Sequence, residues 1–108
     1  MERMNDQGDV FAAIAAPARR QILSKLAEGE LPVMQIAESF DMSLSAISQH
    51  LAILKDANLV ETIKNGRQRV YRLTPEPLQA VTEWLTQYDK FWSGKLDRLG
   101  TYLEKDDE

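Results

Sequence analysis

The chain has 108 residues, which is enough for one domain with one core and too few for two. Its 44% hydrophobic and 28% charged residues are ordinary for a globular protein and speak against extensive disorder. The lack of cysteine excludes disulfides and thiolate metal sites, and the lack of a signal peptide or a membrane-spanning apolar run leads us to expect a cytoplasmic protein.

The first part of the chain predicts three short helices. Residues 9–15 are apolar and alanine-rich, and a helix there should end before Pro17, because proline disfavours helical geometry at the preceding residue. Pro17 suits the first turn of a second helix, which should stop at Gly29. Pro32 begins a third segment, in which apolar residues recur at helical spacing as far as Phe40.

The next segment predicts a DNA-recognition helix. Residues 41–43 interrupt the apolar pattern briefly enough for the turn of a helix-turn-helix unit, and Ser43 is a good N-cap. One face of the following helix should be buried through Ile47, Leu51, Leu54 and Ala57. The opposite face shows only small or hydrogen-bonding side chains, namely Ser45, Ala46, Ser48 and Gln49. Such a face can approach base edges closely, glutamine can bind adenine through two hydrogen bonds, and alanine can contact a thymine methyl group.

A basic β-hairpin is expected after this helix. The spacing of apolar residues changes toward that of a strand on both sides of Asn65-Gly66, the strongest short hairpin signal, because both residues tolerate positive φ in a type I′ turn. That turn would place Lys64 opposite Arg67 and gather positive charge at the hairpin tip. Adjacent like charges cost stability unless an anion lies nearby. The candidate phosphate or minor-groove contacts are Lys64, Arg67, Gln68 and Arg69.

The charges are unevenly distributed along a chain whose formal net charge is −4. Residues 43–75 hold five bases and two acids, a local net charge of +3. Residues 104–108 hold four acids and one lysine, a local net charge of −3. A basic face on an acidic body is compatible with nucleic-acid binding, and such binding should be strongly weakened by salt.

The last part of the chain predicts a long amphipathic helix. Residues 74–77 are typical of a helix start, with Thr74 as the cap. Apolar residues then recur every three or four positions, close to a heptad seam on a helix of about 26 residues, or about 40 Å. They are Leu78, Val81, Leu85, Tyr88, Trp92, Leu96, Leu99 and Leu103, and Trp84 and Phe91 widen the stripe. A small core cannot cover every face of such a helix, so we expect the remainder to pair two chains.

The order of these elements resembles the ArsR/SmtB family of winged helix-turn-helix transcriptional regulators over nearly the whole chain. The resemblance is carried by Ala-Pro-Ala-Arg-Arg-Gln-Ile-Leu at 16–23, Ser-Ala-Ile-Ser-Gln-His-Leu-Ala-Ile-Leu at 45–54, Asn-Leu-Val at 58–60 and Gly-Arg-Gln-Arg-Val-Tyr-Arg-Leu at 66–73. It implies a homodimer that binds a palindromic operator and represses until an inducer releases it. It also implies that His50 meets a DNA phosphate.

The chain departs from the founding members of that family, which sense metals. Their ligands are a cysteine pair in the helix before the turn, or aspartate and histidine on the last helix. Residues 33–38 contain no cysteine and the last helix has no histidine, so neither site can be built. The chain resembles the cysteine-free branch, whose last helix carries Trp-Leu-x-x-Tyr-x-x-Phe-Trp, here residues 84–92. We expect neither a metal nor a cofactor.

The resulting expectation is one winged helix-turn-helix domain over residues 1–108, mainly α with a small β-hairpin wing. Its parts are an N-terminal helix (1–16), a helical core (17–58), the wing (59–73) and a long C-terminal dimerisation helix (74–105). The domain should be dimeric through its N- and C-terminal helices. The expected interface residues are Phe11, Ile14, Val81, Trp84, Leu85, Tyr88, Trp92, Leu96 and Leu99.

Other interpretations of the same residues stay open. The chain could be a winged-helix protein-interaction module without DNA binding, and the basic wing could merely be solvated. An enzyme is disfavoured because the sequence shows no nucleophile with a base and no glycine-rich phosphate loop. A small hydrophobic effector could bind among Trp84, Tyr88, Phe91 and Trp92. A hard-cation site is disfavoured because its candidate ligands lie two helical turns apart, at Asp89, Asp97 and Glu104.

Overall fold

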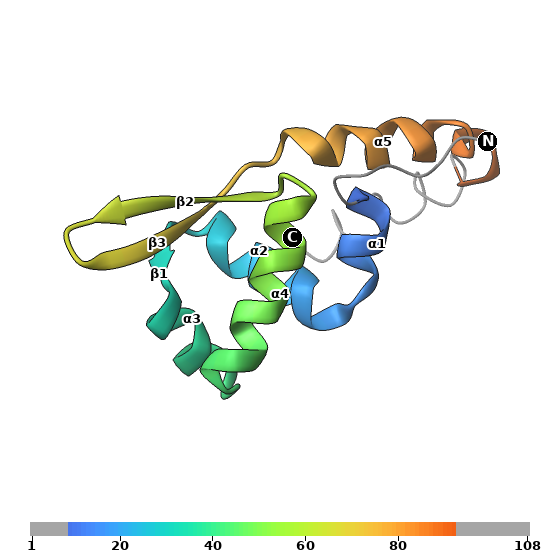
Figure 1. Ribbon diagram of the computed structural model, residues 1–108. Coiled ribbons are helices and arrows are strands. Elements are labelled where there is room, and N and C mark those ends of the chain that lie inside the picture. Colours follow the sequence, from blue (N-terminus) through green and yellow to red (C-terminus); the bar gives the residue numbers. More distant parts are fainter. Residues whose placement is uncertain (1–8, 93–108) are drawn as a thin grey trace, which may run out of the picture.

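The computed structural model describes residues 9–92, which form a small antiparallel sheet, five α-helices and one 3-10 helix. In chain order the elements are α1 (Val10–Ala15), α2 (Pro17–Ala27), β1 (Leu31–Pro32), α3 (Val33–Phe40), α4 (Leu44–Asp56), β2 (Val60–Asn65), β3 (Gln68–Leu73), the 3-10 helix η1 (Glu76–Leu78) and α5 (Gln79–Thr86). The hairpin of β2 and β3 projects from one side of the helices, and α1 and α5 lie on the other side (Figure 1). The expected mainly α fold with a small β-hairpin wing is confirmed.

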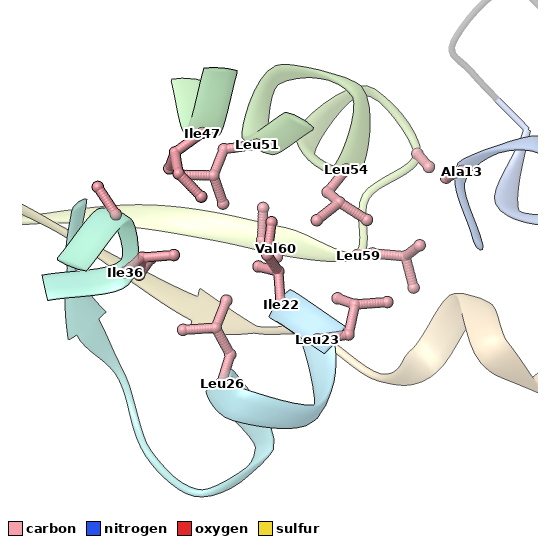
Figure 2. Close-up of a cluster of buried hydrophobic side chains, with 12 residues drawn as sticks. Ala13, Ile22, Leu23, Leu26, Ile36, Ile47, Leu51, Leu54, Leu59 and Val60 are labelled. Atoms are coloured by element: carbon pink, nitrogen blue, oxygen red, sulfur yellow. The ribbon is translucent and has the colours of Figure 1, made fainter. Parts of the chain in front are cut away.

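One hydrophobic cluster joins these elements across the described residues. Ile47, Leu51 and Leu54 of α4 are fully buried and face side chains from α2 and from the start of β2 (Figure 2). The largest fully buried side chains are Ile22, Ile36, Ile47, Leu51, Leu54 and Leu59. Because α4 uses one face for this core, its opposite face is left to solvent, as the helical spacing predicts.

The end of α1, the end of α3 and the start of α4 lie where the sequence predicts them. Ala16 is extended (φ −83°, ψ 128°) before Pro17, so α1 ends there. Asp41 is left-handed (φ 53°, ψ 45°) and ends α3. The Oγ of Ser43 accepts a hydrogen bond of 3.0 Å from the backbone N–H of Ala46, which confirms Ser43 as the N-cap of α4.

The hairpin register differs from the predicted one. Asn65 pairs with Gln68, and Lys64 pairs with Arg69 rather than with Arg67. The two-residue turn is therefore Gly66-Arg67, with positive φ at Gly66 (68°) and not at Asn65. Positive φ at the first central residue alone is the pattern of a type II′ turn, which needs glycine there and suits a hairpin as well as type I′ does. The partner of Lys64 shifts by two residues, so each side chain keeps its predicted face.

The sheet contains a third strand that the sequence does not predict. Leu31 and Pro32 of β1 pair with Tyr71 and Val70, which makes β3 the central strand. A strand of two residues has no alternation to detect, and its proline lies on an edge strand, where proline is tolerated. This strand fixes the wing to the start of α3.

The start of the C-terminal helix also differs from the prediction. Thr74 does not cap it, because its Oγ1 donates to the carbonyl of Asn58 at 2.7 Å. Helix α5 ends at Thr86, residues 87–88 form a turn, and residues 89–92 are helical again. Within residues 78–92, the prediction of a continuous helix is therefore wrong. The Oγ1 of Thr86 and the Nε2 of Gln87 donate to carbonyls three residues earlier, and such side-chain bonds compete with the helical ladder.

Candidate nucleic-acid interface

The outer face of α4 carries the predicted base-contacting side chains. Ser45, Ser48 and Gln49 are exposed, whereas Ala46 is half-buried and less accessible to a thymine methyl group. None of these three exposed side chains makes a hydrogen bond within the described part of the chain, so their polar groups are free to bind a ligand. Two exposed apolar side chains also lie on this helix, Leu44 (46%) and Ile53 (42%), and the expectation of a purely small or polar face missed them.

The N-terminus of α4 favours an anion. The helix has thirteen residues, and its first turn contains no acidic side chain. Unpaired N–H groups and the helix dipole make such a terminus attractive to phosphate. Ser43 is exposed, and because its Oγ accepts the N–H of Ala46, its hydroxyl proton remains available as a donor. Ser43 can therefore cap the helix and bind a phosphate oxygen at once.

Three cations gather at the tip of the β2–β3 hairpin, the wing. Lys64 and Arg69 are cross-strand partners, and Arg67 lies in the adjoining turn. All three are exposed, and none forms an ion pair with a carboxylate in residues 9–92. Gln68 is exposed beside them. The mutual repulsion of these charges favours a bound polyanion.

The base of the wing is electrostatically neutralised. Arg72 pairs across the strands with Glu61, to whose Oε2 its Nη2 donates at 2.6 Å and its Nε at 2.9 Å. These hydrogen bonds, and then the charge of Glu61, raise the pKa of Arg72 above its ordinary value. The positive charge of the wing is therefore concentrated at its tip, and Arg72 does not contribute to it.

His50 lies half-buried on α4 and contacts a residue of α2 that the sequence did not single out as functional. The Nη1 of Arg19 lies 3.3 Å from the Nδ1 of His50. The same guanidinium donates from Nε to the carbonyl of Ala13 at 2.7 Å. The guanidinium thus joins α4 to the last turn of α1.

Arg20, the next residue, also binds the end of α1. Its Nη1 donates to the carbonyls of Ile14 and Ala15 at 2.8 and 3.1 Å. Basic side chains near a helix C-terminus satisfy carbonyls that lack helical partners. The signal in the sequence is the Arg-Arg pair in the first turn after Pro17, but only the fold shows which carbonyls lie within reach.

An aromatic patch is formed by Phe11 of α1, Trp84 of α5, and Tyr88, Phe91 and Trp92 of the segment that follows α5. The ring centroids of Phe11 and Trp84 lie 5.7 Å apart, edge to face, and those of Trp84 and Tyr88 lie 5.4 Å apart. Tyr88 also lies within 6.2 Å of Phe91 and of Trp92. Phe11, Trp84 and Phe91 remain 38%, 48% and 65% exposed, which is unusual for large aromatic side chains.

The remaining residues expected at the interface differ in their exposure. Leu85 is exposed on α5, whereas Val81 is half-buried and Ile14 packs against the core. The structure therefore brings the first and fifth helices together on one surface, as a shared interface requires. Leu96 and Leu99 lie outside the described residues.

Two open cavities lie away from the aromatic patch. A cavity of about 420 Å³ lies along α2 and reaches Phe40, and one of about 410 Å³ lies between α3 and the start of α4. Neither is lined by the aromatic side chains suggested for a hydrophobic effector. In residues 9–92 no three potential metal ligands cluster, and no helix there is long and apolar enough to span a membrane. Asp97 and Glu104 lie outside that part.

Comparison with known proteins agrees with this geometry. The profile of the family described as "Bacterial regulatory protein, arsR family" matches residues 16–62. The HTH-type transcriptional regulator Rv2034 of Mycobacterium tuberculosis is 36% identical over 96 residues, 89% of this chain and 87% of that protein. The transcriptional repressor SdpR of Bacillus subtilis is 38% identical over 80 residues, 74% of this chain and 89% of that protein. A crystal structure described as a possible transcriptional regulator for arsenical resistance is 41% identical, with a TM-score of 0.65, and the match covers 91% of this chain and 96% of that one.

Proposed function

The chain belongs to the arsR family of bacterial regulatory proteins, and from this premise we propose that it is a homodimeric repressor of a palindromic DNA operator. Relatives named as transcriptional regulators and repressors support a DNA-binding regulator, and proteins of this kind are not enzymes. Its proposed place is the cytoplasm, where chromosomal DNA is accessible to it.

The observation that carries this proposal is the free polar face of α4. Ser45, Ser48 and Gln49 are exposed on a helix whose other face is locked into the core, so their positions are rigid. A rigid helix with short polar side chains is what major-groove recognition needs. Gln49 is the proposed base reader, and Ser43 and the wing tip are the proposed phosphate contacts.

The aromatic patch supports the homodimer. Large aromatic side chains half exposed on one surface mark a protein interface more often than an isolated exposed residue does. One small recognition helix also contacts too few base pairs to discriminate an operator from genomic DNA. Two copies paired through α1 and α5 would place their recognition helices in successive major grooves, about 34 Å apart.

The test is selection of bound duplexes from a random pool, followed by titration of the selected duplex. We expect a palindromic consensus, and two chains per duplex by analytical ultracentrifugation. An asymmetric consensus bound by one chain would overturn the homodimer and leave DNA recognition in place. No binding to any duplex at low salt would instead support the protein-interaction module.

A further inference from the structure

The single histidine of the chain is held by a residue outside the recognition helix. The guanidinium of Arg19 contacts the Nδ1 of His50 at 3.3 Å. Its other nitrogens donate to the carbonyls of Ala13 at 2.7 Å and Ala12 at 3.4 Å. One side chain thus connects the last turn of α1 to the middle of α4.

This contact selects one tautomer of the neutral ring. A guanidinium has only donors, so the Nδ1 of His50 accepts the hydrogen bond. In the neutral ring the proton then lies on Nε2. Within residues 9–92 no protein group accepts from Nε2, so the second ring nitrogen presents a free donor on the helix proposed to bind DNA.

We infer that Arg19 is a positioning residue of the DNA interface, which selects the Nε2–H tautomer of His50 and keeps that donor available for a backbone phosphate. The inference rests on the proposed function, because it requires DNA to bind along α4. The role of Arg19 is indirect: three of its five N–H donors are directed at His50 and at the α1 carbonyls, and the imidazole makes the contact with the phosphate.

Arg20 provides a matched control. It also carries a cation on α2 and binds the α1 carbonyls of Ile14 and Ala15, but it does not contact His50. Arg19→Met and Arg20→Met each remove one cation and two carbonyl hydrogen bonds while keeping an unbranched side chain. A difference between them therefore reports the contact with His50 and not the loss of helix capping.

The first readout is the tautomer itself, measured on the ¹⁵N-labelled full chain by long-range ¹H–¹⁵N correlation. With one histidine the ring signals need no assignment, and at about pH 8.5 a free imidazole is neutral. We expect the proton on Nε2 and an accepting Nδ1 in the parent chain and in Arg20→Met. In Arg19→Met the ¹⁵N shift of Nδ1 should move, and Arg19→Lys, which keeps a donor-only cation, should restore it in part. A proton on Nδ1 in the parent chain, or unchanged shifts in Arg19→Met, would overturn the inference.

The second readout is a double-mutant cycle on binding to a selected duplex. We expect Arg19→Met and His50→Gln each to weaken binding about tenfold, and the double variant to bind no more weakly than His50→Gln alone. The salt dependence should be the same in all of them, because a neutral ring releases no counterion. Additive losses, or a shallower salt dependence in Arg19→Met, would mean that Arg19 contacts DNA itself and would overturn the inference.

Failure of the proposed function is recognised separately. If the parent chain binds no duplex, DNA recognition is wrong, and the NMR comparison still decides whether Arg19 sets the tautomer. Thermal unfolding of every variant shows whether it is folded. If Arg19→Met unfolds, the tautomer in Arg19→Lys and the binding of His50→Gln decide the outcome instead.

Discussion

Replacing Arg67 by alanine should make DNA binding less sensitive to salt. Arg67 lies exposed in the turn of the wing, next to the cross-strand pair of Lys64 and Arg69, and has no carboxylate partner in the described part of the chain. A cation that neutralises a phosphate releases a condensed counterion, so the slope of log affinity against log salt changes by about 0.9 for each phosphate that is no longer neutralised.

The magnitude follows from the number of wings. In a dimer, Arg67→Ala removes one arginine from each of the two wings, so the slope should become shallower by about 1.8. Between about 50 and 200 mM salt, the parent should lose roughly 12-fold more affinity than the variant. Fluorescence anisotropy of a labelled duplex, titrated at four or five salt concentrations in this range, measures both slopes.

Arg72→Ala is the charge-matched control in the same hairpin. It removes one positive charge from the chain, as Arg67→Ala does, but its guanidinium is already held by Glu61. The slope for Arg72→Ala should therefore equal that of the parent. Equal slopes for parent and Arg67→Ala would refute phosphate contact by the wing tip, and equal flattening in both variants would show that net charge and not position controls binding.

The other predictions concern the recognition helix and the aromatic patch. Gln49→Ala should weaken binding to the selected duplex by about 5- to 150-fold and leave binding to random DNA nearly unchanged, because a bidentate base contact contributes about 1–3 kcal/mol of discrimination. Equal losses on both duplexes would exclude base reading. Trp84→Ala should raise the dimer dissociation constant about 30-fold in sedimentation experiments. Met34→Ala, which truncates an apolar side chain exposed on α3, should leave this constant unchanged. Equal dissociation constants for the two variants would contradict dimerisation through the patch. Ser43→Ala should lower the free energy of unfolding by about 1 kcal/mol in urea, since the variant cannot form the capping bond to the N–H of Ala46, and an unchanged value would mean that the bond is not stabilising.

The sequence predicts the recognition helix well because its determinants are local. Apolar residues at helical spacing specify which face of α4 enters the core, and Ser43 specifies where the helix begins. Pro17 and the break at 41–43 likewise act within a few residues of where they stand. The exposed positions of Ser45, Ser48 and Gln49 follow directly from that periodicity.

The elements that escape prediction depend on contacts between distant residues or on nearly equal local alternatives. Asn65-Gly66 and Gly66-Arg67 are both acceptable hairpin turns, so the local sequence does not decide the register. The two-residue strand β1 exists only because β3 offers it a partner. The contact of Arg19 with His50 joins residues 31 positions apart, and no periodicity or motif reports it.

Helix α1 contacts both the proposed dimer surface and, through Arg19, the helix that is proposed to bind DNA. With six residues it is too short to be stable alone, so its position is set by its contacts. At one end Phe11 packs against Trp84 of α5, and at the other the carbonyl of Ala13 holds Arg19, which reaches His50. Phe11 and Ala13 are two residues apart, so the aromatic patch and the contact between Arg19 and His50 depend on the placement of the same short helix.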